Sequence, residues 1–168
     1  MTRLTDLEIR RVDYALQKDA TALVFLLDAY AQDAMGGGVG LDSWVKAHLC
    51  SQLSRYPHAC SFIAWQGEQA IGLVNCFETL STFKARPLLN IHDIAVLPAC
   101  RGQGVGMALM QAVETEAIQR GCCKLTLEVL SGNATASKLY TRFGFAPYAL
   151  DEANGQAMFM QKWLLPSA

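Results

Sequence analysis

The residues with the clearest chemical signature form a glycine-rich turn between a predicted strand and a predicted helix. This turn is Arg101-Gly102-Gln103-Gly104-Val105-Gly106, and it follows an apolar run that ends at Pro98. Successive backbone N–H groups in such a turn point into one concavity, and the positive end of the following helix dipole lies beside it. Glycines let a ligand approach the backbone, because no Cβ is in the way. The pattern predicts an anion site suited to a phosphate or a pyrophosphate.

Two common nucleotide-binding loops do not match this turn. A dinucleotide-binding G-x-G-x-x-G pattern needs one more glycine, and the two positions that would supply it are Met107 and Leu109. A P-loop closes on Gly-Lys-Ser/Thr, which this turn lacks. A glycine turn with a purely structural role is the remaining alternative. Three alternating glycines at a strand-to-helix junction argue against it.

The elements that hold the turn follow from hydrophobic periodicity and from turn signals. Predicted strands cover residues 8–13, 60–66, 70–78, 88–97, 124–130, 145–150 and 156–164. Predicted helices begin at an Asp19 cap, near Asp42, after the glycine turn and at Asn133. The resulting order, β-α-α-β-β-β-α-β-α-β-β, is typical of an α/β fold with a mixed sheet covered by helices on both faces. We expect residues 1–168 to form a single domain.

Composition and charge exclude several classes of protein. Of the 168 residues, 52% are hydrophobic and 17% are charged, which excludes intrinsic disorder. The net charge of −1 lacks the basic excess of a nucleic-acid binder or a polybasic membrane surface. Apolar runs stay far short of the ~20 residues that span a bilayer. We therefore expect no nucleic-acid partner and no membrane partner.

Six cysteines and three histidines show no metal-binding spacing. No cysteine pair has C-x-x-C spacing, and the histidines do not complete a zinc pattern. Cys122 and Cys123 are neighbours, and adjacent residues rarely reach disulfide geometry. The sequence predicts reduced thiols in a cytoplasmic protein and no metal.

Two linked motifs resemble a known enzyme family. Arg101-x-x-Gly104-x-Gly106 matches the R/Q-x-x-G-x-G/A acetyl-CoA signature of the GNAT N-acetyltransferases. Residues 91–98 and 121–129 resemble that family's fourth and fifth strands, and residues 133–145 resemble its N-x-x-A-x-x-x-Y-x-x-x-G-F helix. The resemblance implies a mixed, mostly antiparallel, twisted sheet of six to seven strands, with about four helices on both faces and splayed central strands. The segment around Asp93 and the turn looks closest to diamine and small-amine acetyltransferases.

The resemblance also implies how acetyl-CoA would bind as co-substrate. Backbone groups of the fourth strand would pair with the pantetheine arm, and an N–H at or near Val96 would serve as the oxyanion donor. The turn backbone would hold the pyrophosphate. The Arg101 side chain would either add a charge-assisted bond or stay a solvated loop arginine. The predicted cofactor-binding residues are Ile94, Ala95, Val96, Arg101, Gly102, Gln103, Gly104, Val105, Gly106, Asn133, Ala136 and Tyr140.

The predicted catalytic residues are Tyr140, His92 and Asp93. A thiolate leaving group accepts a proton readily from a nearby, slightly acidified phenol, and the resemblance favours Tyr140 as that general acid over a core aromatic. His92 occupies the position where many relatives carry glutamate, and a neutral imidazole is an acceptable base. Asp93 is the second candidate and would point to the opposite face of a regular strand. An ordered water without a single base is the third.

The sequence gives weaker signals for the residues that would bind the acceptor amine. Tyr30, Asp33 and Glu78 are candidate substrate residues, and the two carboxylates would attract an ammonium group. Each carboxylate also fits a solvated surface position. The loop at residues 36–40 fits either a mobile lid or a plain connector.

These observations predict an acetyl-CoA-dependent N-acetyltransferase that acts on a primary amine of a small molecule or a peptide, by direct attack in a ternary complex. The alternatives are a catalytically weak CoA-binding or sensor module and a different phosphate-nucleotide binder.

A homodimer is also expected. The predicted strand over 156–164 is apolar on both faces, with Met158 and Met160 on one and Phe159 and Trp163 on the other. A second copy would cover the extra face, and closed two-fold pairs are the commonest oligomers. The alternative is a monomer in which helices of the same chain cover both faces of this strand.

Overall fold

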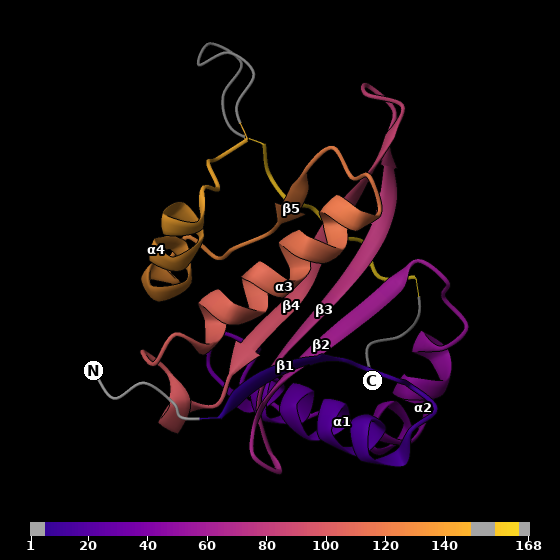
Figure 1. The fold of residues 1–168 in the computed structure, drawn as a ribbon, viewed down its shortest axis with the longest axis vertical. Coiled ribbons are helices and arrows are strands. Elements are labelled where there is room, and N and C mark those ends of the chain that lie inside the picture. The colour runs from indigo at the N-terminus through magenta and orange to yellow at the C-terminus, as the bar shows by residue number, and fades with distance from the viewer. Residues whose placement is uncertain (1–5, 149–156, 165–168) are drawn as a thin grey trace.

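The computed structural model describes residues 6–148 and 157–164. Its strands form one open sheet in the order β1-β2-β3-β4-β5 (Figure 1). The strands are β1 (Leu7–Arg11), β2 (Ala59–Gln66), β3 (Gln69–Ser81), β4 (Arg86–Val96) and β5 (Leu125–Leu127). β1 to β4 pair antiparallel, and β5 pairs parallel to β4. The predicted mixed, mostly antiparallel sheet is confirmed.

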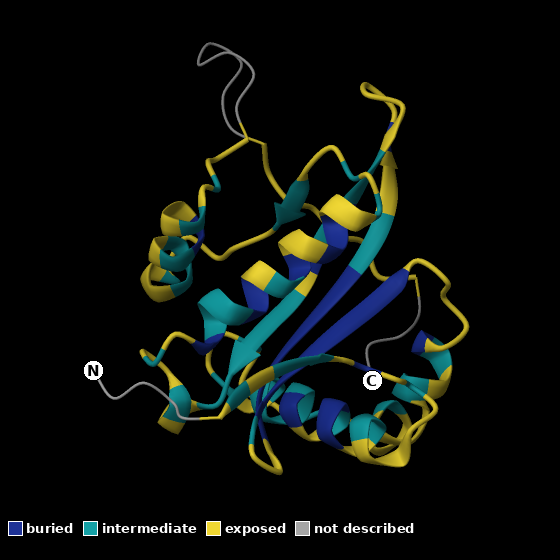
Figure 2. Cartoon of the chain, in the orientation of Figure 1, coloured by how far each residue is buried: buried dark blue, intermediate teal, exposed yellow. Residues whose placement is uncertain are grey.

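Four α-helices cover the two faces of this sheet. They are α1 (Gln17–Gln32), α2 (Ser43–Leu53), α3 (Val105–Gln119) and α4 (Ala134–Phe143), and a short 3-10 helix, Pro98–Cys100, follows β4. α1 and α2 lie on one face, and α3 lies on the other with α4 beside it (Figure 1). Each face has its own buried apolar cluster, and β2 and β3 between them are buried along most of their length (Figure 2). β4 pairs with β3 along its length and with β5 over only three residues.

Local sequence signals explain where three of the helix ends lie. Asp42 caps α2, because its side chain accepts a hydrogen bond from the Val45 N–H at 2.8 Å. Asn133 caps α4 in the same way through the Ala136 N–H at 3.1 Å. Gly144 ends α4 with φ 106°, a left-handed conformation that favours glycine. The predictions at Asp42, Asn133 and Gly144 are confirmed.

The predicted cap at Asp19 is wrong. α1 begins at Gln17, and Leu16 at its N-terminal boundary makes no side-chain cap. Asp19 lies in the first turn, where its negative charge interacts favourably with the positive end of the helix dipole. Its carboxylate accepts a hydrogen bond from the backbone N–H of Asp13 at 3.0 Å. Asp19 therefore ties the helix to the loop before it.

The sheet has five strands in the described residues, where six to seven were expected. β5 covers three residues instead of 124–130, and residues 145–148 and 157–164 form no strand. The rest of the two predicted last strands lies outside the described residues. A strand needs a hydrogen-bonding neighbour as well as an apolar pattern, and the pattern alone does not name that neighbour. The predicted two-faced strand at 157–164 is replaced by an exposed segment, with Met158, Phe159, Met160, Trp163 and Leu164 each 73–86% exposed.

Candidate active site

β4 and β5 separate partway along their length and leave an open strand edge. Their pairing runs from Leu89 to Ile91 and stops there. The Leu97 N–H donates to the Ile71 carbonyl on β3 at 2.9 Å. Because alternate residues of an antiparallel strand face alternate sides, the N–H groups of Ile94 and Val96 point away from β3 toward this open edge. The predicted splay of the central strands is present, and it leaves backbone donors available.

The glycine turn lies directly beyond the open edge, at the start of α3. Gly102 and Gly104 have φ values of 73° and 91°, which strain any residue with a side chain. No atom lies within 4 Å of a Cβ built on either residue, so the space above this backbone is free. Gly106 faces inward instead, where a Cβ would lie 3.0 Å from Leu139 of α4. The turn thus has two glycines that leave space for a ligand and one that lets α3 and α4 pack closely.

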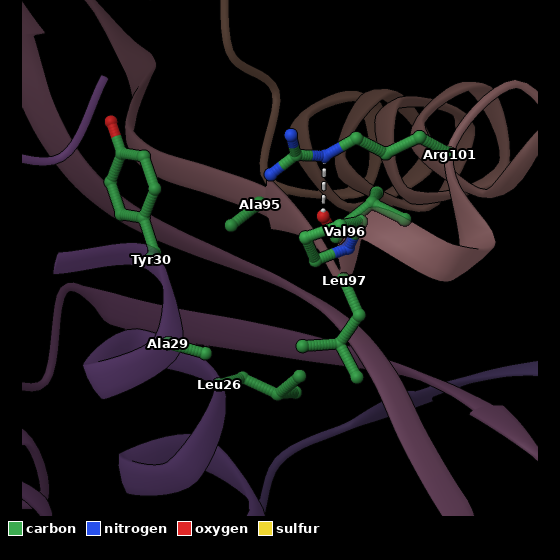
Figure 3. A pocket seen from close by; sticks show the side chains of 8 residues that line it. Leu26, Ala29, Tyr30, Ala95, Val96, Leu97 and Arg101 are labelled. Carbon is green, nitrogen blue, oxygen red and sulfur yellow. Dashed lines mark hydrogen bonds between the residues drawn. The ribbon is translucent and has the colours of Figure 1, made fainter. Parts of the chain in front are cut away.

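The Arg101 side chain is bound within the chain. Its Nε donates to the Val96 carbonyl at 3.0 Å (Figure 3). Its Nη2 donates to Asp33 Oδ2 at 2.8 Å. A hydrogen bond from the Met35 N–H and a second from Arg101 hold the pKa of Asp33 below its ordinary value. Arg101 therefore links the end of β4 to the end of α1.

A cavity of about 110 Å³ lies beside the open edge, between β4, α4 and the end of α1. The three motif residues of α4, Asn133, Ala136 and Tyr140, all line it. His92 lines it from β4, and Tyr30 lines it from α1. Ile94 also lines it from β4, so the structure brings together six residues that the sequence singled out. The cavity also has an acidic lining residue, Glu128, and its lining includes no lysine or arginine from the described part of the chain.

Tyr140 is the most buried of the polar residues around this cavity. Only 8% of the residue is exposed, and burial raises the pKa of its phenol to about 12, with a smaller contribution from the nearby Tyr30. The sequence had suggested a slightly acidified phenol, and the surroundings act in the opposite direction. The hydroxyl therefore keeps its proton throughout the neutral range.

A bulge in β4 places His92 and Asp93 on the same face of the sheet. Asn75 of β3 lies opposite Asp93, whereas the next residue, Cys76, lies opposite Ile91, so His92 is the extra residue. The His92 ring meets Phe77 edge-on at 5.4 Å between centroids, and Asp93 Oδ2 accepts a hydrogen bond from Asn75 Nδ2 at 3.0 Å. The expectation of opposite faces is wrong, because it assumed a regular strand.

Asp93 belongs to the face that carries α1. Tyr30, which lines the cavity, has a raised pKa. The burial of Tyr30 is the larger cause, and the negative charge of Asp93 adds to it. Asp93 itself lies next to the lining residues His92 and Ile94 without contributing to the lining. The bulge thus places a carboxylate at the border of the cavity.

Glu78, a candidate substrate residue in the sequence, does not line this cavity. Its carboxylate forms an ion pair with Arg120 at 3.0 Å, and His58 Nδ1 lies 3.4 Å from its other oxygen. Arg120 also pairs with the buried Glu116 at 2.7 Å, and Glu116 pairs with Arg11 at 2.8 Å. This network joins β1, β3 and the end of α3, so Glu78 has a structural place in the sheet. Glu128 is the acidic residue that the sequence reading missed, and only its position after β5 could have suggested it.

The comparisons with known proteins agree with this geometry. Residues 25–145 match the model of the Acetyltransferase (GNAT) family. The chain belongs to this family. This GNAT chain is 36% identical over 94 residues to thialysine N-epsilon-acetyltransferase of Bos taurus, covering 56% of the chain and 54% of the relative. It is 46% identical over 65 residues to streptothricin acetyltransferase of Streptomyces lavendulae, covering 39% of the chain and 34% of the relative.

A solved structure extends the likeness in fold to nearly the whole chain. It is an aminoglycoside acetyltransferase from an uncultured soil metagenomic sample, in complex with sisomicin. The TM-score is 0.76 at 18% identity, with 95% of this chain and 97% of the other covered. In sequence, the chain spans about half the length of the bovine relative and about a third of the Streptomyces one.

Other kinds of site are absent from the described ranges, 6–148 and 157–164. No group of three or more His, Cys, Asp or Glu side chains there is arranged to hold a metal ion. Within the same ranges, no helix has the length and apolar character needed to cross a bilayer. All six cysteines are free.

Proposed function

We propose that this GNAT chain is an acetyl-CoA-dependent N-acetyltransferase that acts on a primary amine of a small molecule, by direct attack in a ternary complex. One observation carries the proposal: the open edge of β4, the buried Tyr140 and the bulge residue His92 meet at one cavity, with Asp93 next to His92 at its border. Acyl transfer to an amine needs an oxyanion donor, a proton donor and a proton acceptor, and this arrangement has one of each.

The residues along the open edge fit acetyl-CoA. Free N–H groups at Ile94 and Val96 suit the amides of a pantetheine arm, and Asn133 and Ala136 lie across the cavity from them. The turn backbone and the N-terminus of α3 suit a pyrophosphate, because their N–H groups converge where the space is free. Arg101 contributes through its bond to the Val96 carbonyl, which holds the end of the edge in place.

Each candidate residue has one role in the reaction. Acetyl-CoA, when bound, supplies an acetyl group activated as a thioester. The N–H of Val96 or Ile94 stabilises negative charge on an oxygen at the open edge. Tyr140 holds a proton at its buried hydroxyl and would deliver it to the thiolate leaving group. His92, exposed to solvent on its other side, takes the proton that an attacking ammonium must lose.

The chemistry of the cavity favours a cationic acceptor. Glu128 lines it, Asp93 lies at its border, and Asp33 lies near Tyr30 at the end of α1. No lysine or arginine among the lining residues opposes a positive charge. The relatives named for thialysine and streptothricin and the structure bound to sisomicin support an amine that carries further polar groups.

Steady-state assays with acetyl-CoA test the proposal against both alternatives. The amine panel contains thialysine, spermidine, sisomicin and a short peptide, and free thiol is measured. We expect turnover with at least one small cationic amine and little with the peptide. Acetyl-CoA binding without turnover would support a sensor module. Thermal stabilisation by ATP or NAD in preference to acetyl-CoA would support a different nucleotide binder.

The exposed apolar segment supports a homodimer. The five large apolar side chains at 158–164 form a solvent-facing group that a single copy leaves uncovered. We infer that a second copy covers it and that the protein is cytoplasmic, with one domain over 1–168. Sedimentation near 10 µM tests the dimer, and a single species at the monomer mass of 18.4 kDa would reject it.

A further inference from the structure

A line of polar side chains crosses the buried centre of the sheet. Ser61 on β2 and Asn75 on β3 are 1% and 3% exposed, and their immediate neighbours along each strand are apolar. Tyr14, from the loop after β1, reaches Ser61 at one end, and Asp93 on β4 lies at the other. Buried polar groups weaken a core unless they are fully hydrogen-bonded, so a continuous line of them needs an explanation. We call Tyr14, Ser61 and Asn75 the polar chain.

The hydrogen bonds of the polar chain have one direction. Ser61 Oγ donates to Asn75 Oδ1 at 2.6 Å, and Asn75 Nδ2 donates to Asp93 Oδ2 at 3.0 Å. Because the Ser61 proton is used in this bond, the Tyr14 hydroxyl is the donor in its 2.9 Å contact with Ser61 Oγ. Burial raises the pKa of Tyr14, which keeps that donor proton in place. Every donor thus points toward Asp93, an arrangement that suits a charged carboxylate.

The end of the polar chain coincides with the β4 bulge. The bulge turns Asp93 to the α1 face, where Asn75 can reach it, and places it next to His92 at the cavity. Asn75 donates to Oδ2 of Asp93, and Oδ1 of Asp93 makes no hydrogen bond with the described residues. The carboxylate is therefore held by one oxygen, and the other is free for a ligand.

We propose that the polar chain positions Asp93 as the anchor for the ammonium group of the acceptor amine, next to His92. This inference rests on the proposed function and adds three positioning residues to it. The middle of the chain is an amide, and an amide does not pass a proton on without a high-energy tautomer. The polar chain therefore orients the Asp93 carboxylate and does not conduct protons.

The central test compares wild type with Asn75→Leu, which removes the donor to Asp93 and keeps a side chain of similar size in an apolar strand. The assay uses acetyl-CoA with whichever of thialysine, spermidine and sisomicin the wild type acetylates fastest. Hydrogen bonds to charged groups contribute enough that we expect kcat/KM for the amine to fall about 10- to 100-fold. The loss should lie mainly in KM for the amine. Acetyl-CoA affinity, measured by calorimetry, should stay within about twofold of wild type.

Two further variants separate positioning from folding. The triple variant Tyr14→Phe, Ser61→Ala, Asn75→Leu removes all three buried polar groups together, so none of these three positions keeps an unpaired donor or acceptor, and such all-apolar replacements cost little stability. The half-buried Asp93 loses its donor in this variant and can bind water instead. We expect it to fold and to show the same KM defect. Ser61→Ala alone should raise KM severalfold, and Ser61→Thr should restore it, because threonine keeps the hydroxyl donor.

A matched control comes from the opposite face of the same strands. Cys60 and Cys76 lie next to Ser61 and Asn75, are equally buried and contact each other. Cys60→Ala perturbs β2 and β3 without touching the polar chain, and we expect an unchanged KM. An equal rise in KM in Cys60→Ala and Ser61→Ala, or full kcat/KM in the folded triple variant, would overturn the role of the polar chain. A wild type that acetylates none of the amines would overturn the proposed function and this inference together.

Discussion

The two sides of the cavity are built from different kinds of group. The donor side consists of backbone: the open edge at Ile94 and Val96, and the turn whose glycines leave its N–H groups uncovered. The acceptor side consists of side chains, with His92 and Asp93 held by a bulge and a polar chain from neighbouring strands. A backbone site needs only the correct local conformation, whereas a side-chain site needs several strands in register. The first is therefore visible in a short motif, and the second is not.

Tyr140→Phe tests the residue where the two sides meet. The change removes the proton and keeps the buried ring, so kcat should fall on the order of 10²–10⁴-fold while acetyl-CoA affinity and amine KM change little. Steady-state kinetics with calorimetry measure this. Tyr56→Phe, at an exposed tyrosine after α2, is the control and should retain full kcat. A Tyr140→Phe variant with nearly full kcat would assign the proton donor elsewhere.

The raised pKa of Tyr140 predicts a loss of stability at high pH. Its pKa is about 12 in the folded chain and about 10 when unfolded, so its contribution is complete below pH 10 and is lost as pH rises through 12. Two pKa units correspond to about 2–3 kcal/mol of unfolding free energy. Urea denaturation at pH 9 and pH 12 measures the drop. Tyr140→Phe should show a drop smaller by that amount, and identical drops would contradict the burial of the phenol.

A pair of glycine variants separates the donor side from the acceptor side. Gly104 and Gly37 both have positive φ, 91° and 114°, and neither has an atom within 4 Å of a built Cβ. Gly104→Ala should weaken acetyl-CoA binding at least about tenfold, because the new methyl group stands over the turn and strains it. Gly37→Ala carries similar strain next to Met35 and should leave acetyl-CoA affinity unchanged. Equal losses in both variants would mean that strain, not position, decides the affinity.

Arg101→Gln tests the one side chain that connects the two sides. Glutamine can still donate to the Val96 carbonyl, but it loses the ion pair with Asp33. Exposed ion pairs contribute roughly 0–1 kcal/mol, so we expect at most a few-fold rise in amine KM and little change in acetyl-CoA affinity. Asp33→Asn should behave in the same way. A large loss of acetyl-CoA affinity in Arg101→Gln alone would show that the guanidinium binds the cofactor directly.

The sequence by itself determined the family, the glycine turn, the α4 motif and most helix and strand positions. These features depend on local conformation: glycines with positive φ at 102 and 104, side-chain caps at Asp42 and Asn133, and apolar periodicity. Each of them is specified by residues within a few positions of one another. Asn133, Ala136 and Tyr140, which line the cavity, were singled out by the family motif that they match, because spacing alone did not favour a functional role for Tyr140.

Only the tertiary structure decided how the acceptor side is arranged. The β4 bulge depends on the register between β3 and β4, and it moved Asp93 to the face of His92. Three pairings join residues that lie 18 to 68 positions apart in the sequence. Glu78 pairs with Arg120, Arg101 with Asp33, and Asn75 with Asp93. The physical reason is that strand register and long-range pairing are set by which neighbours a strand finds in the folded sheet. A single strand's own sequence does not specify those neighbours.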